Sequence, residues 1–293
     1  MQCYHVSEFI SDAFQHAEKP MKTLYVVATP IGNLEDVTLR AVRILNEVNL
    51  IAAEDTRVTR KLLSHYDIHT RLISYNEQNR KARLPFLLER LTEMNVALVS
   101  DAGTPGIRDP GRELVEKAVK SGISVVPVPG PSALTAAISV SGLPADQFLF
   151  LGYLPRNKKE RQELLESMAD ETRTLVAFEV PHRLKASLAD LAVTFGTDRF
   201  LMVGREMTKV YEEIYRGEIS EAINHFSEPR GEYTFVITGA SLSSEPSSLL
   251  LESVATDLQK LKAEGALARE AVKAISEKYR LPRRRVYAMW LQV

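Results

Sequence analysis

Short apolar runs alternate with helical stretches along the first half of the chain, and this alternation limits the fold more than any other feature. Four runs have the length and composition of buried strands: residues 24–28, 50–53, 96–99 and 125–128. Four stretches between or after them have apolar residues at helical spacing: 36–48, 58–66, 84–94 and 111–120. Strands that alternate with helices run parallel, with helices on both faces of the sheet. The pattern therefore predicts an α/β fold.

The second half repeats this alternation with less regular spacing. It predicts strands at 148–151, 175–178 and 200–203, helices at 159–168 and 182–195, and late strands at 210–219 and 232–238. Antiparallel pairing of the late strands stays open. Because proline and glycine interrupt the pattern at 129–132, we place a domain boundary there. We expect an N-terminal extension at 1–22 and two α/β domains at 23–130 and 131–240.

A linker and a helical appendage are expected at 241–293. The stretch 239–248 has the small polar composition of linkers. Three helices are predicted after it: 249–262, 266–279 and 282–291. Arg283, Arg284 and Arg285 lie close to the turn between the last two predicted helices and are candidates for RNA contacts. A solvated helical cap that packs on the body or on a partner is the alternative.

Composition narrows the classes of protein to which this chain could belong. Its 293 residues have a formal net charge of −1, which does not indicate a nucleic-acid binder by global charge. No apolar run approaches the length that spans a bilayer, and the first 20 residues lack the features of a secretory signal. Cys3 is the only cysteine, so we expect neither an internal disulfide nor a cysteine metal cage. The cytoplasm is the expected compartment.

Two loops rich in glycine and proline follow neighbouring predicted strands, with the sequences VSDAGTPGIRDPG (99–111) and VPVPGPSA (126–133). Ligand crevices of open α/β sheets form at such strand ends. Gly103 and Gly106 allow close backbone approach, and Asp101 can accept from a ribose hydroxyl or an amine. The N–H groups of a helix that starts after Ser132 attract a carboxylate. These features suit a nucleoside with an amino-acid tail, such as S-adenosylmethionine (SAM), although tight structural turns are the alternative.

Two common nucleotide-binding motifs are absent from the sequence. The first predicted strand is followed by TPIGNLED, which has one glycine where a dinucleotide fingerprint needs three. The phosphate-binding motif GxxxxGK[ST] does not occur either. His65 and His69 have the spacing of a metal pair, but no third ligand stands out, so no metal site is expected.

Several motifs together resemble a known family. VATPIGNLEDVTLRA, AAEDTR, VSDAGTPGIRDPG, VPVPGPSA, FEVPHR and REMTK occur in the order found in the tetrapyrrole (precorrin-type) methylase superfamily, over roughly residues 24–239. Relatives that methylate porphyrinoids usually carry a GGDP-like loop where this chain has AGTP. SDAGTP and AEDTR resemble the branch of the superfamily that acts on ribosomal RNA.

The resemblance implies two α/β domains with SAM in the cleft between them, usually in a homodimer. It also implies 2′-O-methylation of a cytidine ribose in the decoding region of 16S rRNA, in the small ribosomal subunit. Carried over by position, the cofactor contacts are Pro30, Ala102, Gly103, Thr104, Ile107, Ser132, Ala133, Glu179 and Met207. The chain departs from the common FYESPHR pattern, since it has AFEVPHR at 177–183.

A ribose hydroxyl is a weak nucleophile, so a general base would assist its methylation. The catalytic candidates near predicted strand ends are Asp101, Glu54 and Asp55, and Glu179, His182 and Lys209 are further candidates. An ordinary carboxyl is a poor base for an alcohol unless burial raises its pKa. Each of these residues could instead form an ion pair or cap a helix.

Arg57 and Arg60 are candidates for contacts with RNA phosphates. Two other functions stay open at this stage. One is a methylase of a small molecule such as a porphyrinoid, and the other is a ribosome-assembly factor without catalysis. No membrane partner is expected.

Overall fold

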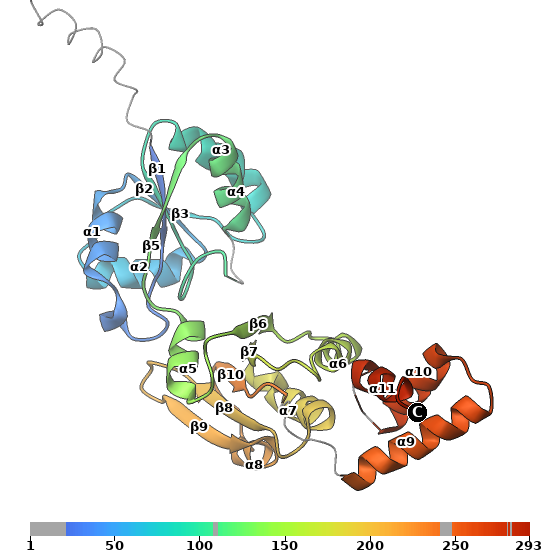
Figure 1. The fold of residues 1–293 in the computed structure, drawn as a ribbon. Helices are drawn as coiled ribbons and strands as arrows, with labels where there is room; N and C mark the ends of the chain where they lie inside the picture. The colour runs from blue at the N-terminus through green and yellow to red at the C-terminus, as the bar shows by residue number, and fades with distance from the viewer. Residues whose placement is uncertain (1–21, 108–110, 241–247, 280, 282) are drawn as a thin grey trace, which may run out of the picture.

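The computed structural model describes residues 22–107, 111–240, 248–279, 281 and 283–293. The predicted N-terminal extension lies outside these residues apart from its last position. The described chain forms two five-stranded sheets and a group of C-terminal helices (Figure 1).

The first sheet is parallel and has the strand order β3-β2-β4-β1-β5. Its strands are β1 (Thr23–Val27), β2 (Leu50–Ala53), β3 (Leu72–Ser74), β4 (Val96–Val99) and β5 (Ser124–Val128). Helices α1 (Leu39–Glu47) and α2 (Thr56–His65) cover one face, and α3 (Arg80–Leu91) and α4 (Arg112–Lys120) cover the other (Figure 1). Because both faces are covered, every residue of β2 and β4 is buried.

The second sheet is mixed and has the order β6-β7-β10-β8-β9. Its strands are β6 (Phe148–Tyr153), β7 (Thr174–Glu179), β8 (Phe200–Arg205), β9 (Glu213–Glu218) and β10 (Tyr233–Ile237). Only β6 and β7 pair in parallel, so the late strands are antiparallel. Its helices are α5 (Ala133–Ser141), α6 (Lys158–Ser167), α7 (Pro181–Phe195) and α8 (Ile219–His225). Helix α5 packs on the face opposite to α6, α7 and α8.

The predicted α/β class is confirmed, and the differences lie in the bounds of two elements and in two short elements. The helix expected over 36–48 is divided into a 3-10 turn, η2 (Leu34–Asp36), and α1, whose N-cap Thr38 accepts a hydrogen bond from the backbone of Ala41. The strand expected over 210–219 begins only at Glu213. Its first residues belong to a loop in which Glu206 and Thr208 have positive φ, a conformation that strands exclude. The short β3 and α8 were not predicted.

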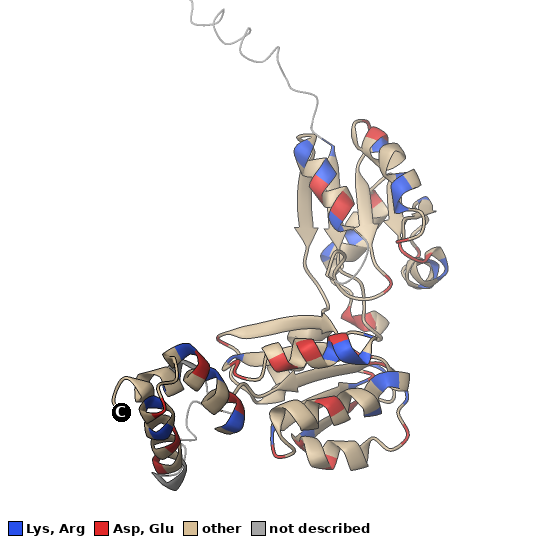
Figure 2. Cartoon of the chain, turned by 90° about the vertical axis from the view of Figure 1, so that its right-hand side faces the viewer, with Lys and Arg blue, Asp and Glu red and all other residues tan. Residues whose placement is uncertain are grey.

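Three helices at the C-terminus share a core of their own. They are α9 (Ser248–Ala263), α10 (Ala268–Tyr279) and α11 (Arg283–Trp290), as predicted. Their buried apolar residues, among them Leu258, Ile275 and Trp290, pack on one another. Acidic and basic residues are mixed along these helices (Figure 2).

A buried ion pair joins two helices of the second domain. Arg161 on α6 and Asp190 on α7 have side chains only 4% and 7% exposed, with the Nη2 and Oδ2 atoms 2.6 Å apart. Gln162 donates a second hydrogen bond to Asp190, and Arg161 also donates to the carbonyl of Pro155. The removal of one partner would leave a buried charge without compensation.

We therefore predict that Asp190→Ala lowers the free energy of unfolding by about 3–5 kcal/mol, measured by urea denaturation followed by circular dichroism. The exposed pair between Arg43 and Glu47 supplies the control. Glu47→Ala should cost less than about 1 kcal/mol. Equal effects of the two substitutions would contradict the prediction.

Candidate functional site

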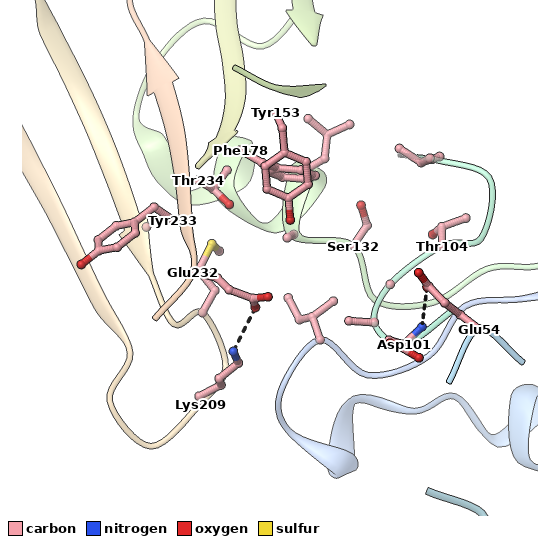
Figure 3. A pocket seen from close by; sticks show the side chains of 18 residues that line it. Glu54, Asp101, Thr104, Ser132, Tyr153, Phe178, Lys209, Glu232, Tyr233 and Thr234 are labelled. Carbon is pink, nitrogen blue, oxygen red and sulfur yellow. Dashed lines mark hydrogen bonds and ion pairs between the residues drawn. The ribbon is translucent and has the colours of Figure 1, made fainter. Parts of the chain in front are cut away.

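A crevice with a volume of about 230 Å³ lies between the two domains (Figure 3). From the first sheet it is lined by residues that follow β1, β2 and β4: Ile31, Glu54, Asp101, Ala102, Gly103, Thr104 and Ile107. Ser132, Ala133 and Leu134 contribute from the start of α5. The second domain contributes Tyr153, Phe178, Gly204, Met207, Lys209, Glu232, Tyr233 and Thr234. The predicted loops therefore do line one crevice.

A backbone pair ties the loop after β1 to the loop after β4. Thr29 and Gly103 exchange two hydrogen bonds, each with an N–O distance of 2.9 Å. The hydroxyl of Thr29 also donates to the carbonyl of Ser100. Gly103 has a φ of 75° and Gly106 a φ of 83°, which glycine adopts without the strain that a side chain would add. The loop is thus held with its backbone against the crevice.

Two carboxylates lie side by side at this edge of the sheet. Glu54 follows β2 and Asp101 follows β4, and these strands are paired in parallel. The backbone N–H of Asp101 donates to Oε2 of Glu54 at 3.3 Å (Figure 3). The N–H of Asp55 donates to Oδ1 of Asp101 at 2.9 Å. Burial raises the pKa of both Glu54 and Asp101, and each is further raised by a neighbouring carboxylate. Both groups hold a proton more readily than ordinary carboxyls do.

Asp55 has a different environment from these two. It is the N-cap of α2, and it accepts from the backbone N–H of Arg57 at 2.8 Å. The guanidinium of Arg57 also binds its carboxylate, at 2.6 Å. These hydrogen bonds from Arg57 lower the pKa of Asp55 to about 2. Asp55 therefore stays ionised and paired, which does not suit a base that accepts a proton at neutral pH.

Lys209 also lines the crevice, but it is held as a cation. Its Nζ atom lies 3.0 Å from Glu232 (Figure 3) and 2.9 Å from Glu206. Burial lowers the pKa of Lys209, but the hydrogen bonds to these carboxylates outweigh it, so the pKa lies above its ordinary value. A protonated amine cannot act as a base.

The start of α5 faces the crevice. Ser132 occupies the N-cap position, but within the described chain its side chain makes no capping hydrogen bond. Its hydroxyl and the first N–H groups of α5 remain available to a ligand that lies in the crevice. A carboxylate is the group that such a helix end favours.

The remaining predicted cofactor contacts are divided between three places. Ile107 and Met207 line the crevice with the glycine loop. Pro30 lines an adjoining cavity instead. Glu179 is fully buried, where it accepts from Ser187 and from the N–H of Val180 and pairs with Arg183 at 2.6 Å. Glu179 thus anchors the start of α7 and does not line the crevice.

Sequence analysis missed the aromatic side of the crevice. Tyr153 and Phe178 end the parallel strands β6 and β7, and their rings meet edge to face at 5.5 Å. Tyr233 and Thr234 begin β10. The only signal in the sequence was the position of an aromatic residue at each strand end. Gly204 leaves room for Met207, because a Cβ at position 204 would lie 2.7 Å from the sulfur of Met207.

The predicted RNA contacts lie outside the crevice. Arg60 is exposed on α2, and Arg57 is exposed although it is paired with Asp55. Arg285 is half-buried on α11, and the side chains of Arg283 and Arg284 lie outside the described residues. His182 is exposed at the start of α7.

Among the described residues, no group of three or more His, Cys, Asp or Glu side chains could hold a metal ion. In the same part of the chain, no helix combines the length and the apolar character needed to cross a membrane.

Comparisons with known proteins place this geometry in context. Residues 23–223 match the family model of the Tetrapyrrole (Corrin/Porphyrin) Methylases. A protein of Synechocystis sp. named "Ribosomal RNA small subunit methyltransferase I" is 48% identical over 276 residues, which cover 93% of this chain and 99% of that protein. Proteins of the same name from Bacillus subtilis and Escherichia coli O157:H7 are 41% and 42% identical, over 93% and 79% of this chain and 95% and 82% of theirs.

Solved structures share the fold at lower sequence identity. The crystal structure of a uroporphyrin-III-C-methyltransferase from Thermus thermophilus aligns with a TM-score of 0.54 and 20% identity, and covers 73% of this chain and 93% of that one. A cobalt precorrin-4 methyltransferase aligns with a TM-score of 0.57 and 17% identity, over 74% and 95%. These likenesses concern the fold.

The opposite pKa shifts of Glu54 and Asp55 predict opposite effects of pH on stability. Glu54 has a raised pKa, so its ionisation destabilises the folded state once the pH rises above its ordinary value of 4.5. Glu54→Gln should therefore raise the free energy of unfolding at about pH 7, and this gain should vanish below 4.5.

Asp55→Asn is the matched control. Asp55 has a lowered pKa, so it contributes stability above its ordinary 3.8, and this contribution is lost as the pH falls toward about 2. The asparagine can still cap α2, but it loses the charge that pairs with Arg57, so this variant should be less stable than the wild type at neutral pH. Urea denaturation at several pH values measures both effects, and a shift of the same sign in the two variants would refute the assignment.

Proposed function

This chain belongs to the tetrapyrrole (corrin/porphyrin) methylase family. We propose that it methylates 16S ribosomal RNA with SAM as the methyl donor. The proposed target is the 2′-hydroxyl of a cytidine. One observation carries the choice of substrate. Relatives named as methyltransferases of small-subunit ribosomal RNA match up to 93% of this chain at 40–48% identity, beyond the end of the family model at residue 223. The porphyrinoid enzymes share only the fold, at 20% identity or less.

The chemistry of the crevice fits this donor. SAM combines a carboxylate, cationic amine and sulfonium groups, and an adenosine. The start of α5 suits the carboxylate, and Asp101 and Glu54 suit a cation. The backbone at Gly103 allows close approach, and Tyr153 with Phe178 offers an aromatic wall for a base. Pro30 and Glu179 take no part in this set.

SAM supplies, when bound, a methyl group on a positively charged sulfur, and S-adenosylhomocysteine leaves after the carbon–sulfur bond breaks and the methyl carbon bonds to the ribose oxygen. The protein then has two tasks, which are to align the ribose hydroxyl and to accept its proton. We assign to Asp101 the role of accepting the proton of the ribose hydroxyl, because burial raises the pKa of its carboxyl toward the range of a useful base. Glu54 has the role of a positioning residue, because it accepts a hydrogen bond from the backbone of Asp101.

The RNA would contact surfaces outside the crevice. Arg57 and Arg60 on α2 are placed to meet phosphates near the active site, and Arg283, Arg284 and Arg285 at the C-terminal turn would add contacts farther away. The proposal includes two further points: the enzyme works as a homodimer, and it works in the cytoplasm.

The assignment of substrate predicts the product. With labelled SAM, the protein should transfer label to small ribosomal subunits from cells that lack this gene, and not to uroporphyrinogen. Mass mapping of the RNA should find the added methyl on a cytidine ribose. Label in the tetrapyrrole alone would overturn the proposal, and binding of subunits without any transfer would favour an assembly factor.

The role of Asp101 predicts a loss of rate. Asp101→Asn should lower kcat by about 10²–10⁴-fold, because the proton acceptor is removed while the side chain keeps its shape. In the wild type, the rate should fall as the pH decreases through the raised pKa of Asp101, since the protonated carboxyl cannot accept another proton. Affinity for SAM, measured by titration calorimetry, should change far less than kcat.

Asp55→Asn is the control for this experiment, because Asp55 is a neighbouring carboxylate that caps α2. Its kcat should stay within a few-fold of the wild type. If Asp55→Asn lowers kcat as much as Asp101→Asn does, the assignment of Asp101 as the proton acceptor is wrong.

A further inference from the structure

A second cavity, of about 240 Å³, adjoins the crevice. Its walls come from the loop after β1, from α2 and from the segment that begins at Ser100. Five residues line both cavities: Ile31, Asp101, Ala102, Lys209 and Glu232. The two spaces are therefore neighbours of similar volume, and Asp101 lies where they meet. The donor, as assigned above, accounts for only one of them.

A buried hydroxyl without a partner lines this second cavity. Thr59 on α2 is only 3% exposed, and within the described chain its Oγ1 atom has no hydrogen-bond partner. A helical threonine commonly donates to the carbonyl one turn earlier, as Thr256 does to Glu252 at 2.8 Å. A buried hydroxyl that lacks a partner costs stability. Because the Oγ1 atom is shielded from the cavity, a ligand there does not reach it, and Thr59 belongs to the cavity wall.

The rest of the cavity has the character of a site for a nucleoside. Pro30, Leu34, Val58 and Leu62 give it apolar walls, against which a flat base can pack. The charged residues Asp101, Lys209 and Glu232 are shared with the crevice, and Thr29, Lys61 and Ser100 add further polar groups. The cavity thus combines apolar walls with a carboxylate at its border with the crevice.

The outer side of α2 carries positive charge next to this cavity. Arg57, Arg60 and Lys61 are all exposed, and Lys61 lines the cavity itself. Phosphates on both sides of an inserted nucleoside would need cations at the rim. Arg60 and Lys61 have no hydrogen bond or ion pair in the described structure, so both are available for that contact.

We propose that this second cavity receives the acceptor nucleoside, turned out of the RNA chain, with its ribose hydroxyl facing Asp101. An enzyme that acts on a nucleotide within a folded RNA must bring that nucleotide out of the stack. At the junction, the ribose oxygen bonds to the transferred methyl carbon and its proton passes to Asp101, while the sulfur keeps the electron pair of the broken bond. This inference rests on the proposed function and names the part of the molecule that holds the substrate.

A bulky substitution in the cavity wall and a matched control test whether the nucleoside enters this cavity. Val58→Trp adds bulk to its wall, and Val119→Trp on α4 is the control, since both valines are exposed on helices of the first domain. Val58→Trp should raise KM for small ribosomal subunits by about tenfold or more, while the Kd for SAM stays within about twofold. Val119→Trp should leave both constants unchanged.

Each outcome decides one point. If Val58→Trp methylates subunits with the KM of Val119→Trp, the nucleoside does not enter this cavity. If Val58→Trp loses affinity for SAM while KM for subunits is unchanged, the cavity belongs to the donor. Failure of the wild type to methylate RNA would instead refute the proposed function, so the two failures are distinguishable.

Discussion

The site depends on the parallel pairing of β2, β4 and β1, which brings three strand ends to one edge of the sheet. Parallel strands end on the same side, so residues that directly follow them meet although they are far apart in sequence. The two hydrogen bonds between Thr29 and Gly103 then fix the first loop to the third. Without that pair the glycine loop would have no fixed position against the second domain. The crevice and the second cavity both have a wall made by this junction.

The carboxyl groups at this edge of the sheet have different pKa values because their surroundings differ. Glu54 and Asp101 are partly buried with few compensating charges, so their pKa values rise. Asp55 lies next to Glu54 in sequence, but it faces Arg57 at the start of a helix, so its pKa falls. Three carboxylates at two strand ends thus acquire different chemistry from their local partners. This separation is the reason to assign the proton to Asp101 and the cap to Asp55.

In the proposed function, two neighbouring cavities divide the recognition of two substrates. The crevice is built by both domains, and its aromatic and glycine walls suit a cofactor. The second cavity is built mainly by the first domain and is bordered by the basic outer side of α2. Because Asp101 lines both, one side chain can contact the group that leaves the donor and the hydroxyl that receives it.

Sequence patterns alone predicted the α/β class, most strands of both sheets and the loops that line the crevice, because hydrophobic periodicity and glycine positions are local properties. The family motifs also predicted Ala102, Gly103, Thr104 and Ser132 as cofactor contacts, and all four line the crevice. Which carboxylate is buried depends on tertiary packing, since burial is set by segments from elsewhere in the chain. The tertiary structure likewise placed Glu179 in the core and left the hydroxyl of Thr59 without a partner. No periodicity along the chain encodes these contacts, because they join segments that meet only after folding.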